Sequence, residues 1–206
     1  MIITSNLATG KIIVMSAPSG AGKSSILKRV INGKNKSDIS SLVSYTTRKP
    51  RSGEIDGQNY FFITKNVFKK MIDNKMFAEW AMVHNNYYGT SKKLLHDTLN
   101  STQKVILEID VQGAIQIKHL YPETCMIFIM TPNLKSLYNR LILRQQDSIE
   151  IINERLENAK QELKFINYYD YLVINNHNKL NDAVKAVEII IESLNYKITN
   201  NKLFFD

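Results

Sequence analysis

The sequence predicts an α/β protein in which a mostly parallel sheet is covered by helices on both faces. Two patterns lead to this prediction. Residues 11–16 form a short β-branched run that is followed by a glycine-containing loop and then by a helical pattern. From residue 92 onward, helical and strand-like segments alternate, as they do in βα units. The length of 206 residues, with 44% hydrophobic and 22% charged residues, suits one folded domain.

The first half of the chain is expected to hold two strands, one helix and an insertion. Pro18, Gly20 and Gly22 form the loop after the first strand. The apolar stripe of the following helix consists of Ile26, Leu27, Val30 and Ile31. A second strand is expected at Leu42–Tyr45, before the polar, turn-rich stretch 48–57. Aromatic residues crowd residues 60–88, which predicts a small α+β insertion with its own apolar cluster.

The second half is expected to continue the alternation. Helices are predicted over residues 92–100, from Gly113 onward, from Leu134 onward, and over 179–194. Strands are predicted over residues 104–110, 124–130 and 171–174. Asp147 and Glu150 resemble a capping box at the start of a further helix that reaches Phe165.

Charge and cysteine content limit the function classes. Lys and Arg number 27 against 19 Asp and Glu, and this formal charge of +8 attracts polyanions and phosphorylated small molecules alike. The single cysteine, Cys125, lies in an apolar run and is expected to be a core residue. The apolar runs are far shorter than the ~20 residues of a membrane span, and residues 1–6 do not resemble a secretory signal. We therefore expect a cytoplasmic protein with no membrane partner.

Residues 17–24 differ from the phosphate-loop pattern GxxxxGK(S/T) only at Ala17. Gly20 and Gly22 would let backbone amides turn toward phosphate oxygens, and the helix that follows would present its positive end to them. Lys23 would reach the β and γ phosphates, and the Ser24 hydroxyl would coordinate Mg²⁺. The alternative is an ordinary strand-to-helix turn, but the flanking strand and helix favour nucleotide binding.

A pair of carboxylates, Glu108 and Asp110, lies at the end of the strand predicted over residues 104–110. Residues two apart on a strand point to the same side. Ligands of open α/β sheets bind beyond the carboxyl ends of the strands, so Asp110 would lie near the metal ion or its waters. For Glu108, a polar residue that marks the end of a buried strand is nearly as good an interpretation.

The sequence resembles the guanylate kinase family from about residue 11 to residue 194. The motifs that carry the resemblance occur in order: SAPSGAGKSS (16–25), SYTTRKPR (44–51), GQNY (57–60), EW (79–80), NYYG (86–89), EIDVQG (108–113), and Arg140, Arg144 and Arg155. The resemblance implies a P-loop NTPase core over residues 11–44, 92–133 and 161–206. It also implies a nucleoside-monophosphate-binding region over 45–91 and a helical lid over 134–160.

The resemblance implies transfer of the γ-phosphoryl group of MgATP to GMP or dGMP. The implied ATP-binding residues are Ala17, Pro18, Ser19, Gly20, Ala21, Gly22, Lys23, Ser24, Ser25 and Asn175. The implied GMP-binding residues are Ser44, Arg48, Arg51, Tyr60, Glu79, Tyr88, Thr90, Glu108 and Asp110. The implied catalytic residues are Lys23, Arg48, Arg140, Arg144 and Arg155. Mg²⁺ is the implied cofactor, held by Ser24 and, through water, by Asp110.

The choice of base follows from the hydrogen bonds that a carboxylate can accept. Glu79 can accept from guanine N1–H and from the 2-amino group together, whereas adenine offers an acceptor at N1 and nothing at C2. Such a site can reject adenine by a factor on the order of 10⁴. By the resemblance, Ser44 and Thr90 donate to guanine O6. Relatives often carry glycine where this chain has Gln145, so we expect the lid to bend differently here.

Two other function classes remain open from the sequence. A catalytically silent guanylate-kinase-like domain could bind phosphopeptides through Arg48, Arg51 and Tyr60, although the intact Gly22-Lys23-Ser24 speaks against it. A basic nucleic-acid binder would use the aromatic and basic middle segment, but no recognition motif supports it. We therefore expect ATP and GMP as partners and no nucleic acid. The oligomeric state, a homo-oligomer included, is left open.

Overall fold

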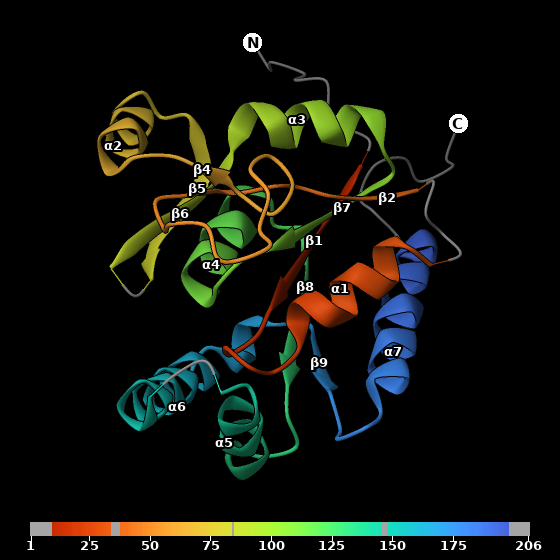
Figure 1. Cartoon of the computed structure of the whole chain (residues 1–206). Coiled ribbons are helices and arrows are strands. Elements are labelled where there is room, and N and C mark those ends of the chain that lie inside the picture. The colour runs from red at the N-terminus through yellow and green to blue at the C-terminus, as the bar shows by residue number, and fades with distance from the viewer. Residues whose placement is uncertain (1–9, 34–37, 84, 146–147, 198–206) are drawn as a thin grey trace.

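A five-stranded parallel sheet forms the centre of the protein in the computed structural model (Figure 1). The structure describes residues 10–33, 38–83, 85–145 and 148–197. The strands follow the order β2 (Ile39–Ser41), β7 (Lys104–Glu108), β1 (Lys11–Ser16), β8 (Cys125–Met130) and β9 (Tyr171–Ile174). All four pairings between them are parallel. The predicted α/β fold with a parallel sheet is confirmed.

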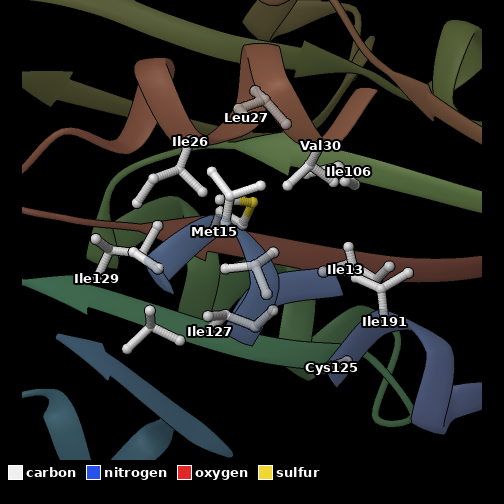
Figure 2. Close-up of a cluster of buried hydrophobic side chains, with 14 of the residues drawn as sticks. Ile13, Met15, Ile26, Leu27, Val30, Ile106, Cys125, Ile127, Ile129 and Ile191 are labelled. Atoms are coloured by element: carbon white, nitrogen blue, oxygen red, sulfur yellow. The ribbon is translucent and has the colours of Figure 1, made fainter. Parts of the chain in front are cut away.

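Helices cover both faces of this sheet because side chains alternate along its strands. Ile13 and Met15 of β1 pack in a cluster with α1 (Lys23–Ile31) and α7 (Leu180–Ser193). Figure 2 shows this cluster, in which branched side chains from the helices and strands fill the space between them. Ile12 and Val14 pack in a second cluster with α3 (Lys92–Ser101) and α4 (Val111–Leu120).

Cys125 belongs to the first of these clusters and is 3% exposed. Burial raises the pKa of its thiol to about 12. The side chain is therefore a packing residue, as its apolar surroundings in the sequence predict.

A second, four-stranded sheet lies beside the first and is built from residues 45–91. Its order is β4 (Phe61–Phe62), β3 (Tyr45–Thr46), β6 (Asn86–Ser91) and β5 (Phe77–Val83), and α2 (Lys65–Asp73) belongs to the same region. The ring of Phe68 stacks on Phe77 at 4.4 Å and on Tyr87 at 5.2 Å between centroids. These contacts give the insertion the aromatic cluster that the sequence predicts.

The helices α5 (Leu134–Leu143) and α6 (Ile149–Leu163) form a separate pair, at the lower left of Figure 1. Leu137, Leu141 and Ile152 pack in a third cluster with Phe128 and Ala21. The predicted cap Asp147 lies outside the described residues. The N-cap of α6 is Ser148, whose hydroxyl accepts a hydrogen bond from the amide of Ile151. Short 3₁₀ helices follow at Ile166–Tyr168 and Leu194–Tyr196.

Three predicted boundaries are wrong. The strand expected at Leu42–Tyr45 is replaced by β2 and β3, which belong to different sheets, and residues 42–44 carry the chain from one to the other. The strand expected over residues 104–110 ends at Glu108. The helix expected after Gly113 begins at Val111, because the Asp110 carboxylate caps it by accepting a hydrogen bond from the Gly113 amide at 2.8 Å.

None of the helices in the described part of the chain is long and apolar enough to span a bilayer.

Candidate active site

The loop between β1 and α1 is shaped to hold an anion. Gly20 and Gly22 have φ angles of +96° and +97°, in the left-handed region that favours glycine. Gly22 is the N-cap of α1, and no side chain caps the helix there. The first amide groups of α1 therefore point toward the loop without an intrahelical acceptor, and the helix dipole favours negative charge at the same place. This is the geometry expected of a phosphate-binding loop.

Asn175, predicted to bind ATP, and Arg140, predicted to be catalytic, support this loop from behind. The buried side-chain amide of Asn175 donates to the carbonyl of Ala21 at 2.8 Å. Arg140 donates to the same carbonyl at 3.2 Å and to the carbonyl of Asn175 at 2.7 Å. A side chain at Gly22 would collide with the Asn175 amide. The loop is thus held in shape by contacts that reach it from α5 and from the segment after β9.

Lys23 and Ser24 face the end of β7. Lys23 Nζ donates to the carbonyl of Ile109 at 3.2 Å, and Ser24 Oγ donates to Glu108 Oε1 at 2.5 Å. Asp110 Oδ1 accepts from the Gly113 amide, but Asp110 Oδ2 is buried with no hydrogen-bond partner in the described part of the protein. Asp110 and Ser24 line the same cavity, and a carboxylate oxygen without a partner together with a serine hydroxyl is a set of oxygen donors that suits Mg²⁺ and its waters.

The carboxylates and histidines of the described residues form no cluster of three or more that could hold a metal ion by itself. A magnesium ion here would therefore need oxygen ligands from a bound nucleotide in addition to those from the protein.

A buried carboxylate forms the far wall of the site. Glu79 of β5 is 3% exposed, and its Oε1 accepts a hydrogen bond from Thr90 Oγ1 at 2.5 Å. The Ser44 and Thr90 hydroxyls are 3.5 Å apart. Burial raises the pKa of Glu79 to about 7; the charge of Asp110 also raises it, whereas the hydrogen bond from Thr90 lowers it. The three residues predicted to read guanine are therefore close together.

A cluster of arginine and tyrosine side chains lines the same cavity as Glu79 and the phosphate loop. The Arg48 guanidinium lies over the rings of Tyr60 and Phe62, at 5.5 and 5.7 Å from their centroids. The rings of Tyr60 and Tyr88 are 5.8 Å apart. Burial raises the pKa of Tyr60 to about 12, so its hydroxyl stays protonated and can donate a hydrogen bond. Such a set of donors suits a phosphate dianion.

The helix pair α5 and α6 contributes two arginines to the site. Arg155 Nη1 donates to Ser19 Oγ of the phosphate loop at 2.8 Å. Arg144 is the C-cap of α5, and Gln145, which follows it, has a φ of 49°. The left-handed backbone at this position is one that glycine adopts at lower energy than glutamine.

These side chains surround one cavity of about 500 Å³. It is lined by all the predicted site residues except Ala21, Thr90, Arg140 and Asn175. Ala21 is a buried residue of the phosphate loop, Arg140 and Asn175 hold its carbonyl from behind, and Thr90 lies behind Glu79. The amide groups before Lys23 and the guanidinium groups of Arg48 and Arg51 therefore open into the same space.

The comparisons with known proteins agree on one family. The family model described as guanylate kinase matches residues 9–194. The chain belongs to the guanylate kinase family. It is 42% identical to the guanylate kinase of Caldanaerobacter subterraneus over 193 residues, which is 94% of this chain and 92% of the relative. It is 43% identical to the guanylate kinase of Buchnera aphidicola over 199 residues, which is 96% of each chain.

A solved structure of the same family has the same fold. The crystal structure of guanylate kinase from Anaplasma phagocytophilum aligns with a TM-score of 0.73 at 28% identity, covering 92% of this chain and 88% of that one. The family resemblance inferred from the motifs is therefore confirmed.

Three polar residues that line the cavity, Glu54, Asn59 and Glu162, are not among the site residues predicted from the sequence. Glu54 forms an ion pair with Arg48 at 2.8 Å, and Glu162 lines the cavity near Lys23. Burial raises the pKa of Glu162 to about 7, against the effect of Lys23 and together with that of Asp110. The spacing contained a signal for Glu162, since it follows Arg155 by seven positions and so shares a helix face with it.

Proposed function

We propose that this chain transfers the γ-phosphoryl group of MgATP to GMP or dGMP, giving ADP and GDP or dGDP. Membership of the guanylate kinase family makes it an ATP:GMP phosphotransferase, a nucleoside monophosphate kinase. The observation that carries the proposal is the single cavity into which the phosphate loop, the arginine pair and Glu79 all open. Donor and acceptor phosphates bound there would be close enough to react.

The donor side is assigned to the phosphate loop. The amides before Lys23 would hold the β-phosphate, and the Lys23 ammonium would move from the Ile109 carbonyl to the β and γ oxygens. Asn175 and Arg140 would keep the loop in shape and border the adenine. A magnesium ion held here would supply positive charge that offsets the negative charge of the phosphates. Ser24 and Asp110, the latter through water, would hold the ion.

The acceptor side is assigned to the insertion, residues 45–91. Arg48, Arg51, Tyr60 and Tyr88 would hold the GMP phosphate. Glu79 would accept from guanine N1–H and the 2-amino group. Ser44 and Thr90 would donate to O6; for this the Thr90 hydroxyl would turn its proton from Glu79 Oε1 to the base, which frees that oxygen to accept from guanine.

The reaction needs no general base in this proposal, because the attacking group is already an anionic phosphate oxygen. Catalysis then consists of positioning and of neutralising charge. Arg144 and Arg155 would gather around the transferring group when α5 and α6, the predicted lid over residues 134–160, close over the nucleotides. The bond from Arg155 to Ser19 ties α6 to the donor loop.

The proposal is tested by ADP formation with GMP, AMP, UMP or no acceptor. We expect GMP to support a rate far above the others, by a factor on the order of 10³ or more. Lys23→Ala should lower this rate by about 10²- to 10³-fold, while GMP binding measured by calorimetry changes less than about threefold. Equal rates with AMP and GMP would contradict the assignment of Glu79, and no rate with any acceptor would contradict the kinase proposal.

A silent, phosphopeptide-binding domain is the alternative that the same arginines allow, but no observation favours it. The Gly22–Ser24 segment keeps a phosphate-loop geometry that such a domain would not need. A cytoplasmic location and the domain boundaries given above stay predictions.

A further inference from the structure

The Arg48 guanidinium is held by a carboxylate of its own loop. Arg48 Nη1 donates to Glu54 Oε2 at 2.9 Å, and Arg48 Nη2 donates to Glu54 Oε1 at 2.8 Å. Both side chains are largely buried, with 15% and 18% of their surfaces exposed. The pair is bidentate, which is the stronger and more directional form of the arginine–carboxylate contact. It raises the pKa of Arg48 and lowers that of Glu54.

The contact uses only one edge of the guanidinium. A guanidinium carries five N–H groups in a planar fork, and a carboxylate or phosphate can bind at the Nη1/Nη2 edge or at the Nε/Nη2 edge. Glu54 takes the first edge, and the second proton of Nη1 goes to the carbonyl of Lys49 at 2.7 Å. Neither Glu54 nor the Lys49 carbonyl contacts the Nε/Nη2 edge. The Tyr88 hydroxyl is a further polar group near Arg48 and helps to raise its pKa.

Glu54 also fixes the backbone that carries the second arginine. Its Oε2 accepts from the Arg51 amide at 2.7 Å, and its own amide donates to the Arg51 carbonyl at 3.1 Å. These two bonds close a turn over residues 51–54 that contains Gly53 at a φ of +82°. The rings of Tyr60 and Phe62 fix the plane of the Arg48 guanidinium. One carboxylate thus sets the orientation of Arg48 and the loop conformation at Arg51.

We infer that Glu54 is a positioning residue for the acceptor phosphate. It holds the Nη1/Nη2 edge of Arg48, so that the Nε/Nη2 edge is left for a phosphate beside Tyr60 and Tyr88 in the cavity. The inference rests on the proposed function and adds a residue to it. The direction in which GMP affinity changes when Glu54 is replaced distinguishes positioning from simple electrostatic repulsion. A carboxylate beside a phosphate site repels the dianion, so Coulomb's law alone predicts tighter GMP binding without Glu54; positioning predicts weaker binding.

The test is the Glu54→Gln variant, in which the amide group presents N–H donors to the Nη1 donors of Arg48. We expect the KM for GMP to rise by about tenfold, the loss typical of one charge-assisted hydrogen bond. The KM for ATP and kcat should change less than about twofold, because the donor loop is not touched. The inhibition constant of guanosine, which has no phosphate, should stay unchanged, whereas a merely structural defect would alter it.

Glu123→Gln is the matched control. Glu123 pairs with Lys197 at 3.1 Å on the surface and is largely exposed. The Glu123→Gln variant has the same change of net charge at a site that does not contact the cavity. We expect the KM for GMP of this variant to equal that of the unmodified protein. A second variant, Glu54→Asp, keeps the charge but withdraws the carboxylate by one methylene, so the same rise is expected from it even where Glu54→Gln does not fold.

A double-mutant cycle checks that Glu54 acts through Arg48. Lysine at position 48 cannot be held at two nitrogens, so Glu54→Gln should add less than about threefold to the effect of Arg48→Lys. Full additivity, or an unchanged or lowered KM for GMP in Glu54→Gln, would overturn the inference. Failure of the proposed function is a separate result, because it would appear as absence of GMP-dependent ADP formation by the unmodified protein.

Discussion

The Glu79 carboxylate is buried in surroundings that disfavour its charged form, and this burial controls its protonation state. Burial raises its pKa to about 7 despite the hydrogen bond from Thr90. Two N–H donors from guanine would stabilise the ionised form and lower the pKa again. An adenine base would supply no such donors and would leave the acid either protonated or unpaired. If Glu79 reads guanine as proposed, we expect binding of the base to be coupled to release of a proton from Glu79.

A pH dependence of GMP binding follows. Because the pKa of Glu79 is higher in the unliganded protein than with guanine bound, binding releases a proton below about pH 7. We expect kcat/KM for GMP to be constant above pH 7 and to fall by up to about tenfold per pH unit below it. The measurement is kcat/KM for GMP between about pH 5.5 and 8 at fixed ionic strength and saturating MgATP.

The phosphate of GMP titrates near pH 6 as well, so Glu79→Gln serves as the control. Glutamine does not titrate, and only the contribution of the phosphate should remain in its profile. The same variant should lose most of the preference for GMP over AMP, by about 10²-fold or more. An unchanged pH profile in Glu79→Gln would show that a group other than Glu79 controls binding.

Helix α4 packs against the Glu79 side chain at Gly113, a position at which only glycine fits. A Cβ atom on Gly113 would overlap the Glu79 side chain, since α4 lies directly against β5. The Asp110 cap fixes where the helix begins, and its bond to the Gly113 amide sets Gly113 at the third helical position. One short helix therefore places Asp110 at the cavity and leaves room for the Glu79 side chain there, at the positions proposed for the metal ion and the base.

We expect Gly113→Ala to damage acceptor binding more than folding. Alanine stabilises a helix interior by about 1 kcal/mol over glycine, which offsets part of the strain from the displaced Glu79. The KM for GMP should rise by at least about tenfold, and the KM for ATP should stay within about twofold. Steady-state kinetics and thermal unfolding measure both effects.

Gln112→Ala is the neighbour that serves as a control for helix propensity, because the Gln112 side chain is exposed. It should leave the KM for GMP unchanged. If the KM for GMP were the same in Gly113→Ala and in the unmodified protein, displacement of Glu79 would have no effect on binding of the base.

Local patterns predicted the elements of the large sheet well and their ends less well. β9 lies over Tyr171–Ile174 as predicted, and Lys23 and Glu79, which the motifs single out, line the same cavity. Asp110 was expected on a strand and is instead a helix cap, because a side chain that can accept from the Gly113 amide starts the helix earlier than periodicity indicates. The strand expected at Leu42–Tyr45 was wrong because an apolar run does not show that the chain changes sheets within it.

Glu54 could not be found by periodicity or by motif chemistry. It lies in a polar turn, where an acidic residue is usually a solvated side chain. Its role depends on a turn that brings its carboxylate back to Arg48, six positions earlier, and on rings from β4 and its flank that bury the pair. Such contacts are set by tertiary structure, so a sequence shows the residue and not its partner.

Segments that are far apart along the chain build the two halves of the active site. The phosphate loop comes from the large sheet, the arginine pair and Glu79 from the insertion, and Arg144 and Arg155 from the α5–α6 pair. None of the three regions has a complete site. Because the cavity is their common boundary, we expect the three regions to close over the nucleotides when these bind.

A ligand that joins both nucleotides tests this arrangement directly. Adenosine and guanosine linked by five phosphates should bind at least about tenfold more tightly than ATP or GMP, because binding of the second half becomes intramolecular. Calorimetry at fixed salt measures the affinities, and inorganic pentaphosphate controls for attraction to the formal charge of +8. Lys23→Ala and Arg48→Lys should each weaken the linked ligand, and replacing its guanosine with adenosine should weaken it by at least about tenfold. If the linked ligand bound no more tightly than ATP, and Arg48→Lys did not weaken it, the phosphate loop and the arginine pair would not bind one ligand together. Phosphoryl transfer between the two sites would then lack its geometric basis.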